Sequence, residues 1–186
     1  MKATIPLAMS SSLGLPSETA PVPKTGADWI AAIRIYVGAV GLGNLVWEFA
    51  QLPLYTIWQT SAASALVFAV LHCTGGDILI ALTSLMLALA LVGNVAWPDC
   101  HFRRVAALTM VFGVGYTIFS EWLNITVRQT WAYTDSMPVV PGLGVGLSPI
   151  LQWLVIPLAG MLLARRWSRP AAGLDGSASR IKPTRT

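Results

Sequence analysis

The chain has 186 residues, of which 55% are hydrophobic and 11% are charged, and its formal net charge is +4. A soluble domain carries roughly 25% charged residues, so this chain has too little polar surface to face water on all sides. Its Lys and Arg residues stand at the ends of apolar segments and near the C-terminus rather than along one face. This distribution argues against a nucleic-acid-binding protein and favours a membrane protein.

Both ends of the chain are expected to be tails. Residues 1–27 are rich in Ser, Pro, Gly and Thr, and their short apolar patch, residues 5–9, falls short of the ~7–15 residues of a signal-peptide core. Residues 168–186 are small, polar and basic, without apolar periodicity. The sequence therefore predicts a disordered cytoplasmic tail over 1–27, a transmembrane domain over 28–167 and a disordered basic cytoplasmic tail over 168–186.

Two apolar segments open the transmembrane domain. The first is expected to cross the membrane over about residues 29–51, because Pro53 cannot continue a regular helix. The second, residues 62–95, is longer than the ~20 residues that one span needs, and Gly75-Gly76 offers a break within it. Two interpretations remain open: one long tilted helix, or an interfacial helix over 62–71 followed by a span over 77–95.

The second half of the chain predicts two further spans. A short loop, residues 98–104, precedes a span over residues 105–128. Residues 129–147 are rich in Pro, Gly and aromatic residues and predict an irregular stretch, either a re-entrant lid or a surface loop. The last span is expected over residues 148–164, with a kink at Pro157.

The distribution of positive charge predicts the orientation. With four spans, all Lys and Arg residues except Arg34 and Arg128 lie in the tails and the 98–104 loop, on one side of the membrane. The positive-inside rule then predicts an all-α bundle of four transmembrane helices with both termini in the cytoplasm. The excess of Arg over Lys, together with abundant Ala and Gly, favours a bacterial inner membrane.

Polar residues gather toward the non-cytoplasmic end of every predicted span. In the first and third spans they recur at helical spacing and so share one helix face. They are Asn44, Glu48, Gln51 and Tyr55 in the first span, His72 and Asp77 in the second, Thr117, Glu121, Asn124 and Arg128 in the third, Gln152 in the fourth, and Trp131, Tyr133 and Asp135 in the irregular stretch. We expect them to surround one cavity at one depth.

The ionisable members of this group carry the candidate chemistry. Glu48, His72, Asp77 and Glu121 could form an acid/base set, because carboxyl groups in a low-dielectric cavity can act as general acids. One His with carboxylates could also hold a metal ion, although the chain has no HExxH motif. The alternative is a structural ion-pair network in which Arg128 neutralises Glu121 or Asp135.

The remaining polar residues are expected to bind the ligand of this cavity. They are Asn44, Gln51, Tyr55, Asn124, Arg128, Trp131, Tyr133, Asp135 and Gln152. Most of the eight Trp residues, Trp97 and Trp153 among them, fall near predicted span ends, where interface anchoring accounts for most of them. The two cysteines, Cys73 and Cys100, are expected near opposite faces of the membrane as unpaired thiols.

One short segment resembles a known family. The stretch Glu48-Phe-Ala-Gln51-Leu-Pro53-Leu-Tyr55 looks like a segment of the four-helix emopamil-binding/sigma-2 membrane family, some members of which isomerise sterols with buried carboxylates. The likeness covers about eight residues, without a matching motif elsewhere. Because His72 and Asp77 follow this segment here rather than preceding it, no catalytic role is carried over.

Three classes of function fit this pattern. The first is an intramembrane enzyme that acts on a lipid or isoprenoid-like molecule, with membrane lipid and a lipid-like small molecule as partners. The second is a transporter or permeation unit for protons, metal ions or a small solute, which would need a polar path that the apolar cytoplasmic halves of the spans do not offer. The third is a non-catalytic assembly subunit. A homo-oligomer remains open, and no cofactor is indicated.

Overall fold

The computed structural model describes residues 26–92 and 97–168, and these residues are mostly helical, as the all-α prediction requires. The long helices are α1 (Gly26–Gln51), α3 (Ala63–Val92), α4 (Phe102–Trp122) and α5 (Leu147–Trp167), and the short ones are η1 (Leu52–Leu54), α2 (Ile57–Thr60) and the π-helical turn η2 (Leu123–Val127). The predicted tails lie almost wholly outside the described residues.

Within the described residues, four helical segments are long and apolar enough to cross a membrane, the same number as the predicted spans. They are Trp29–Leu54, Ala63–Val92, Phe102–Val127 and Leu147–Trp167. Each exceeds the ~20 residues that a bilayer core requires. Large apolar side chains such as Leu42, Leu79 and Val111 are exposed on the outside of the bundle. Such an outer surface suits contact with lipid.

The helix boundaries follow from local breakers. Pro53 lies in η1 just after α1 ends, so the first span stops where the proline predicted. The long second segment is a single helix, α3, that runs through Gly75 and Gly76 without a break. The alternative of a separate interfacial helix over residues 62–71 is therefore wrong. Because its apolar run continues on both sides of the glycines, the pair does not interrupt the helix.

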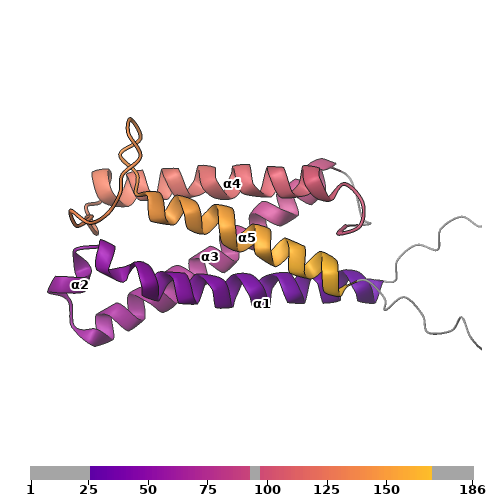
Figure 1. Cartoon of the computed structure of the whole chain (residues 1–186), viewed down its shortest axis with the longest axis horizontal. Helices are drawn as coiled ribbons and strands as arrows, with labels where there is room; N and C mark the ends of the chain where they lie inside the picture. Colours follow the sequence, from indigo (N-terminus) through magenta and orange to yellow (C-terminus); the bar gives the residue numbers. More distant parts are fainter. Residues whose placement is uncertain (1–25, 93–96, 169–186) are drawn as a thin grey trace, which may run out of the picture.

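The four long helices form a bundle in which α1 and α4 are each flanked by α3 and α5 (Figure 1). The helix α3 runs obliquely to the others, starting beside α2 and ending near the start of α4 (Figure 1). The start of α1 and the end of α5 lie at the same end of the bundle as the turn before α4 (Figure 1). This arrangement agrees with the grouping of both tails and the 98–104 loop on one side.

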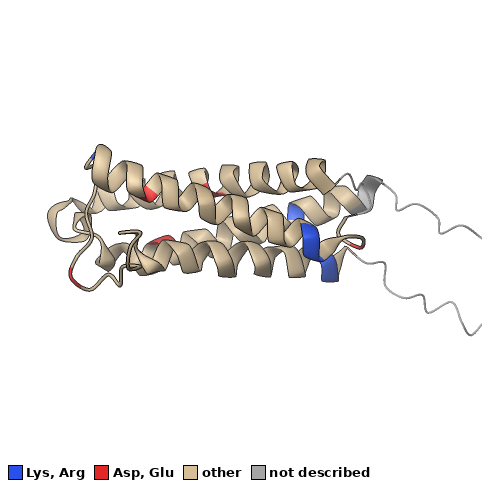
Figure 2. Cartoon of the chain, turned by 90° about the horizontal axis from the view of Figure 1, so that it is seen from above, with Lys and Arg blue, Asp and Glu red and all other residues tan. Residues whose placement is uncertain are grey.

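Charge follows the same division. Most of the described Lys and Arg residues gather at the end of the bundle that holds the chain ends, while most of the Asp and Glu residues lie in the other half (Figure 2). At the basic end, the guanidinium carbon of Arg165 lies 4.8 Å from the centroid of the Phe102 ring. This cation–π contact joins the end of α5 to the start of α4.

The half of the bundle near the basic end is filled by apolar side chains, and we call it the packed half. Its centre contains Tyr36 of α1, Leu85 of α3, Val105 of α4 and Met161 of α5, each 0% exposed. Trp97 belongs to the same core and is 1% exposed, so interface anchoring does not explain this tryptophan. Its ring covers the core at the turn before α4 instead of facing headgroups.

Candidate functional site

A network of side-chain hydrogen bonds centred on Gln152 occupies the half of the bundle opposite the packed half. The Gln152 amide nitrogen lies 2.9 Å from Asn44 Oδ1, 2.9 Å from Glu48 Oε1 and 3.1 Å from Asp77 Oδ2. Asn44 and Glu48 stand one turn apart on α1, so the helix presents both to α5. Residues predicted from three different spans therefore meet at one amide, and Gln152 itself is 2% exposed.

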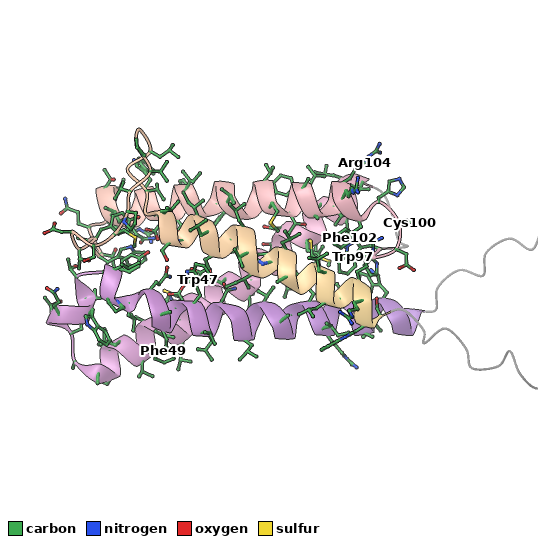
Figure 3. The ribbon with its side chains drawn as sticks, in the orientation of Figure 1. Trp47, Phe49, Trp97, Cys100, Phe102 and Arg104 are labelled. Carbon is green, nitrogen blue, oxygen red and sulfur yellow. The ribbon has the colours of Figure 1, made fainter. Side chains whose placement is uncertain are left out.

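The network continues from Gln51 toward the start of α5. Gln51 Nε2 donates to Glu48 Oε1 at 2.9 Å and to Gln152 Oε1 at 3.1 Å. The hydroxyl of Ser148 donates to Gln51 Oε1 at 2.8 Å and accepts from the indole N–H of Trp47 at 3.1 Å. Trp47 points into the bundle, whereas Phe49, two residues later, points away from it (Figure 3).

Trp47 and Ser148 were absent from the predicted site. A signal for them exists in the sequence, because each stands one helical turn before a predicted member, Gln51 and Gln152 respectively.

The Gln152 amide nitrogen faces more acceptor oxygens than it has hydrogens. An amide NH₂ group has two hydrogens, yet Gln152 Nε2 faces three acceptor oxygens. Asn44, which is 1% exposed, supplies one of these oxygens. Its Nδ2 group has no hydrogen-bond partner among the described residues. At most two of the three oxygens can accept from the Gln152 NH₂ group through separate hydrogens, and a proton on Glu48 or Asp77 would change which of them do. The hydrogen bonding of the network therefore depends on how many protons the two carboxyl groups carry.

A second cluster surrounds Glu121 of α4. The Tyr133 hydroxyl donates to Glu121 Oε2 and accepts from the backbone N–H of Gly146 at 2.8 Å. The ring centroids of Tyr133 and Tyr55 are 5.5 Å apart. Burial raises the pKa of Tyr133 above its ordinary value, and the hydrogen bond to Glu121 raises it further. Burial also raises the pKa of Tyr55, so both phenols stay protonated well into the alkaline range.

The irregular stretch between α4 and α5 covers this cluster, and we call residues 128–146 the cap loop. Two backbone hydrogen bonds tie it to the segment after α1: Thr56 N–H to the Ala132 oxygen and Thr134 N–H to the Leu54 oxygen, both at 2.9 Å. The prediction of an irregular stretch is confirmed. These bonds fix its path, which is why Tyr133 reaches Glu121.

A cavity of about 650 Å³ lies between the two clusters. Ten of the predicted site residues line it: Glu48, Gln51, Tyr55, His72, Asp77, Glu121, Asn124, Arg128, Trp131 and Gln152. Asn44 stands behind Gln152, and Tyr133 stands behind Glu121. Side chains from α1, α3, α4, α5 and the cap loop thus converge on one space, whose size falls within the range of small-molecule sites.

Three predicted members stand apart from the two clusters. His72 lines the cavity, but its side chain is exposed and stacks on Phe68, with ring centroids 5.6 Å apart. Arg128 is exposed at the rim, and Asp135 is exposed and does not line the cavity. Within residues 26–92 and 97–168, Arg128 forms no ion pair with Glu121 or Asp135, so the structural ion-pair network is not formed by these groups.

Over the part of the chain that the structure describes, no three His, Cys, Asp or Glu side chains are grouped so that they could hold a metal ion. Both cysteines are free thiols, as expected: Cys73 lines the cavity, while Cys100 is exposed at the basic end (Figure 3).

Trp153 is a tryptophan that interface anchoring does not explain. It is 3% exposed, lines the inner end of the cavity and lies against Gly113 of α4. A Cβ atom at position 113 would stand 2.2 Å from Trp153 Cε3, so the glycine makes room for the ring. Position in sequence near a span end does not say whether a tryptophan points outward or inward.

Comparison with known proteins finds no family model, no curated protein and no solved structure that matches this chain. The resemblance of residues 48–55 to the emopamil-binding/sigma-2 family therefore remains a sequence-based expectation.

Proposed function

We propose that this protein is an integral membrane enzyme that performs acid/base chemistry on a lipid-like molecule held in the cavity. The observation that carries the proposal is the pair of carboxyl groups, Glu48 and Asp77, that share the Gln152 amide nitrogen at the cavity wall. Carboxyl groups within a membrane span cost several kcal/mol unless they are paired or hydrated. In the described residues neither has a basic partner, so function accounts for their presence better than structure does.

The roles follow from the network. Two carboxyl groups within reach of one nitrogen favour a state in which they share a single proton, because two negative charges at that separation repel each other. The protonated group would donate its proton to the substrate, and the other would take a proton from a neighbouring atom. The step consumes no co-reactant.

Glu121 would act from the opposite wall. The Tyr133 hydroxyl that donates to it would orient its carboxyl group as a base or a binding group. His72, exposed at the rim beside Phe68, remains a candidate for exchanging the catalytic proton with the surroundings.

Transport is the weaker candidate for this site. A transported solute needs a path through both halves of the bundle. Beyond Trp153 the interior is occupied by the fully buried apolar residues of the packed half. A pocket that is closed at one end suits a molecule that enters and leaves on the same side. We propose that this pocket lies in the non-cytoplasmic half of a bacterial inner-membrane protein with both termini cytoplasmic; the gathering of basic residues at the opposite end of the bundle supports this orientation.

The test uses proton transfer itself as the signal. The full-length protein in lipid nanodiscs is incubated in D₂O with lipids extracted from its native membrane. Mass spectrometry then searches for a lipid that gains carbon-bound deuterium. We expect such a lipid with the wild type, and a loss of roughly 10²–10⁴-fold in rate with Glu48→Gln or Asp77→Asn, which is the usual contribution of a general acid or base.

The matched control is Asp135→Asn, an exposed carboxylate outside the cavity, which should deuterate at the wild-type rate. All variants are first checked for membrane insertion and for a single peak in size-exclusion chromatography. Undiminished deuteration by well-folded Glu48→Gln and Asp77→Asn variants would contradict the proposal. Loss of insertion in both would indicate that the carboxyl groups serve the fold instead.

A further inference from the structure

Two hydrogen-bond donors on the Glu121 side of the cavity have no partner. Thr117 lines the cavity from α4, one turn before Glu121; it is 6% exposed, and its hydroxyl oxygen is buried without a partner among the described residues. The indole N–H of Trp131 lies close to the Glu121 carboxyl, yet no atom of the described residues accepts a hydrogen bond from it in good geometry. Buried polar groups are normally hydrogen-bonded, so two unpartnered donors beside one carboxylate point to an oxygen-bearing ligand.

The charge of the wall restricts the head group of that ligand. Glu48, Asp77 and Glu121 all line the cavity, whereas its basic side chains, His72 and Arg128, are exposed at the rim. A phosphate or carboxylate head group would be repelled by carboxylates in a medium of low dielectric constant. An ammonium group would be attracted, but it has no lone pair to accept from Trp131. A hydroxyl group accepts from a donor and donates to a carboxylate, so it fits both features.

The cavity also reaches the outer surface of the bundle. Phe68 of α3 and Tyr116 of α4 both line it, and they are 68% and 49% exposed. Tyr116 lies fourteen residues into α4, about 20 Å from its start at a rise of 1.5 Å per residue, and therefore well within the span. The cavity therefore meets the outer surface between α3 and α4, and α3 runs obliquely to α4 (Figure 1). A hydrocarbon tail can leave there without crossing water.

From these features we infer that the cavity binds an uncharged lipid alcohol. Its hydroxyl oxygen accepts from Trp131 Nε1 and Thr117 Oγ1, its hydroxyl hydrogen is donated to Glu121, and its tail passes between Phe68 and Tyr116 into the membrane. This inference rests on the proposed function and names its substrate class. It places the polar head near both carboxyl clusters and leaves the tail in lipid.

The inference is tested with a long-chain alcohol that carries a photoreactive diazirine in its chain. The full-length protein in nanodiscs is irradiated with this probe, and peptide mass spectrometry locates the adducts. We expect adducts at Phe68 and Tyr116 that an unlabelled long-chain alcohol displaces. Probes of the same chain length with a carboxylate or a trimethylammonium head should label these positions at least tenfold less. Equal or stronger labelling by either charged probe would overturn the inference.

Two substitutions remove the donors: Thr117→Val keeps the shape of the side chain, and Trp131→Phe keeps an aromatic ring of smaller size. Trp131→Phe and Thr117→Val should each weaken displacement by the unlabelled alcohol by about three- to tenfold, the value of one hydrogen bond. Neither donor has a partner in the described part of the chain, so the substitutions cost the fold little. The matched controls are Trp122→Phe and Thr83→Val, whose side chains are exposed and do not line the cavity. Affinity that is unchanged in Trp131→Phe and Thr117→Val would also overturn the inference.

The two proposals fail separately. If deuteration depends on Glu48 but the alcohol probe gives no displaceable labelling, the acid/base function stands and the lipid alcohol is rejected as the substrate class. If displaceable labelling depends on Trp131 but no lipid is deuterated, the protein binds lipid alcohols and the proposed enzymatic activity is rejected.

Discussion

The two halves of this bundle are built from the same four helices in opposite ways. In the packed half, apolar side chains such as Leu85 and Met161 meet with no exposed surface. In the other half, the helices are joined by amide, hydroxyl and carboxyl groups around a cavity. One half of the bundle therefore supplies close apolar packing. The other half is packed less closely and holds polar groups at fixed positions around the cavity.

The division between the two halves is tested most strongly by a pair of substitutions, one in each half. Leu85→Ala should lower the free energy of unfolding by about 2 kcal/mol, the lower end of the usual cost, because lipid rather than water surrounds the separated helices. It should leave deuteration per folded molecule unchanged. Gln152→Leu should abolish deuteration, because Glu48 and Asp77 lose their common donor. Chemical unfolding in detergent and the D₂O assay measure the two effects, and equal loss of activity in both variants would contradict the division.

A smaller effect is expected where the two halves meet. Gly113→Ala should cost about 1–2 kcal/mol, because the new methyl group would stand 2.2 Å from the Trp153 ring and force α4 and α5 apart. Gly115→Ala is the matched control, since a Cβ atom there would meet nothing within 4 Å. Thermal unfolding of the two variants in the same detergent compares them. Similar melting temperatures would mean that the ring moves aside readily.

The smallest effect concerns the cap loop and appears only at alkaline pH. The pKa of Tyr133 is raised in the folded protein above its ordinary value of 10.0, so the folded state favours the neutral phenol. The resulting stabilisation is fully present below pH 10 and is lost as the pH rises above it. Tyr133→Phe should therefore weaken the alkaline decline in stability, measured by unfolding at several pH values. An identical decline in both proteins would show that Tyr133 does not contribute.

Much of the fold could be predicted because it depends on local signals. Apolar runs predicted the four spans, Pro53 marked the end of α1, and the basic residues grouped the loop before α4 with both chain ends. The course of the 62–95 segment could not be decided, because a glycine pair permits a break in a helix without requiring one. The structure resolves it as one helix over Ala63–Val92.

The candidate site was only partly predictable. Helical spacing placed Asn44 and Glu48 on one face, but the partners of that face depend on how α1 and α5 align, which spacing within one helix does not determine. For this reason Ser148 was missed. Likewise, the contact of Tyr133 with Glu121 depends on the path of the cap loop, and Asp135, two residues further on, faces outward. Sequence periodicity predicts faces, whereas partners are set by tertiary packing.

The separation of the hydrogen-bond partners along the chain has a consequence for biosynthesis. Gln51 and Gln152 are 101 residues apart, so the polar groups of the first span leave the ribosome long before the helix that completes their bonds. Until α5 arrives, the nascent first span must hold Asn44 and Glu48 beside the insertion machinery or in water. The polar network of the first span is therefore completed only when the last helix packs against it.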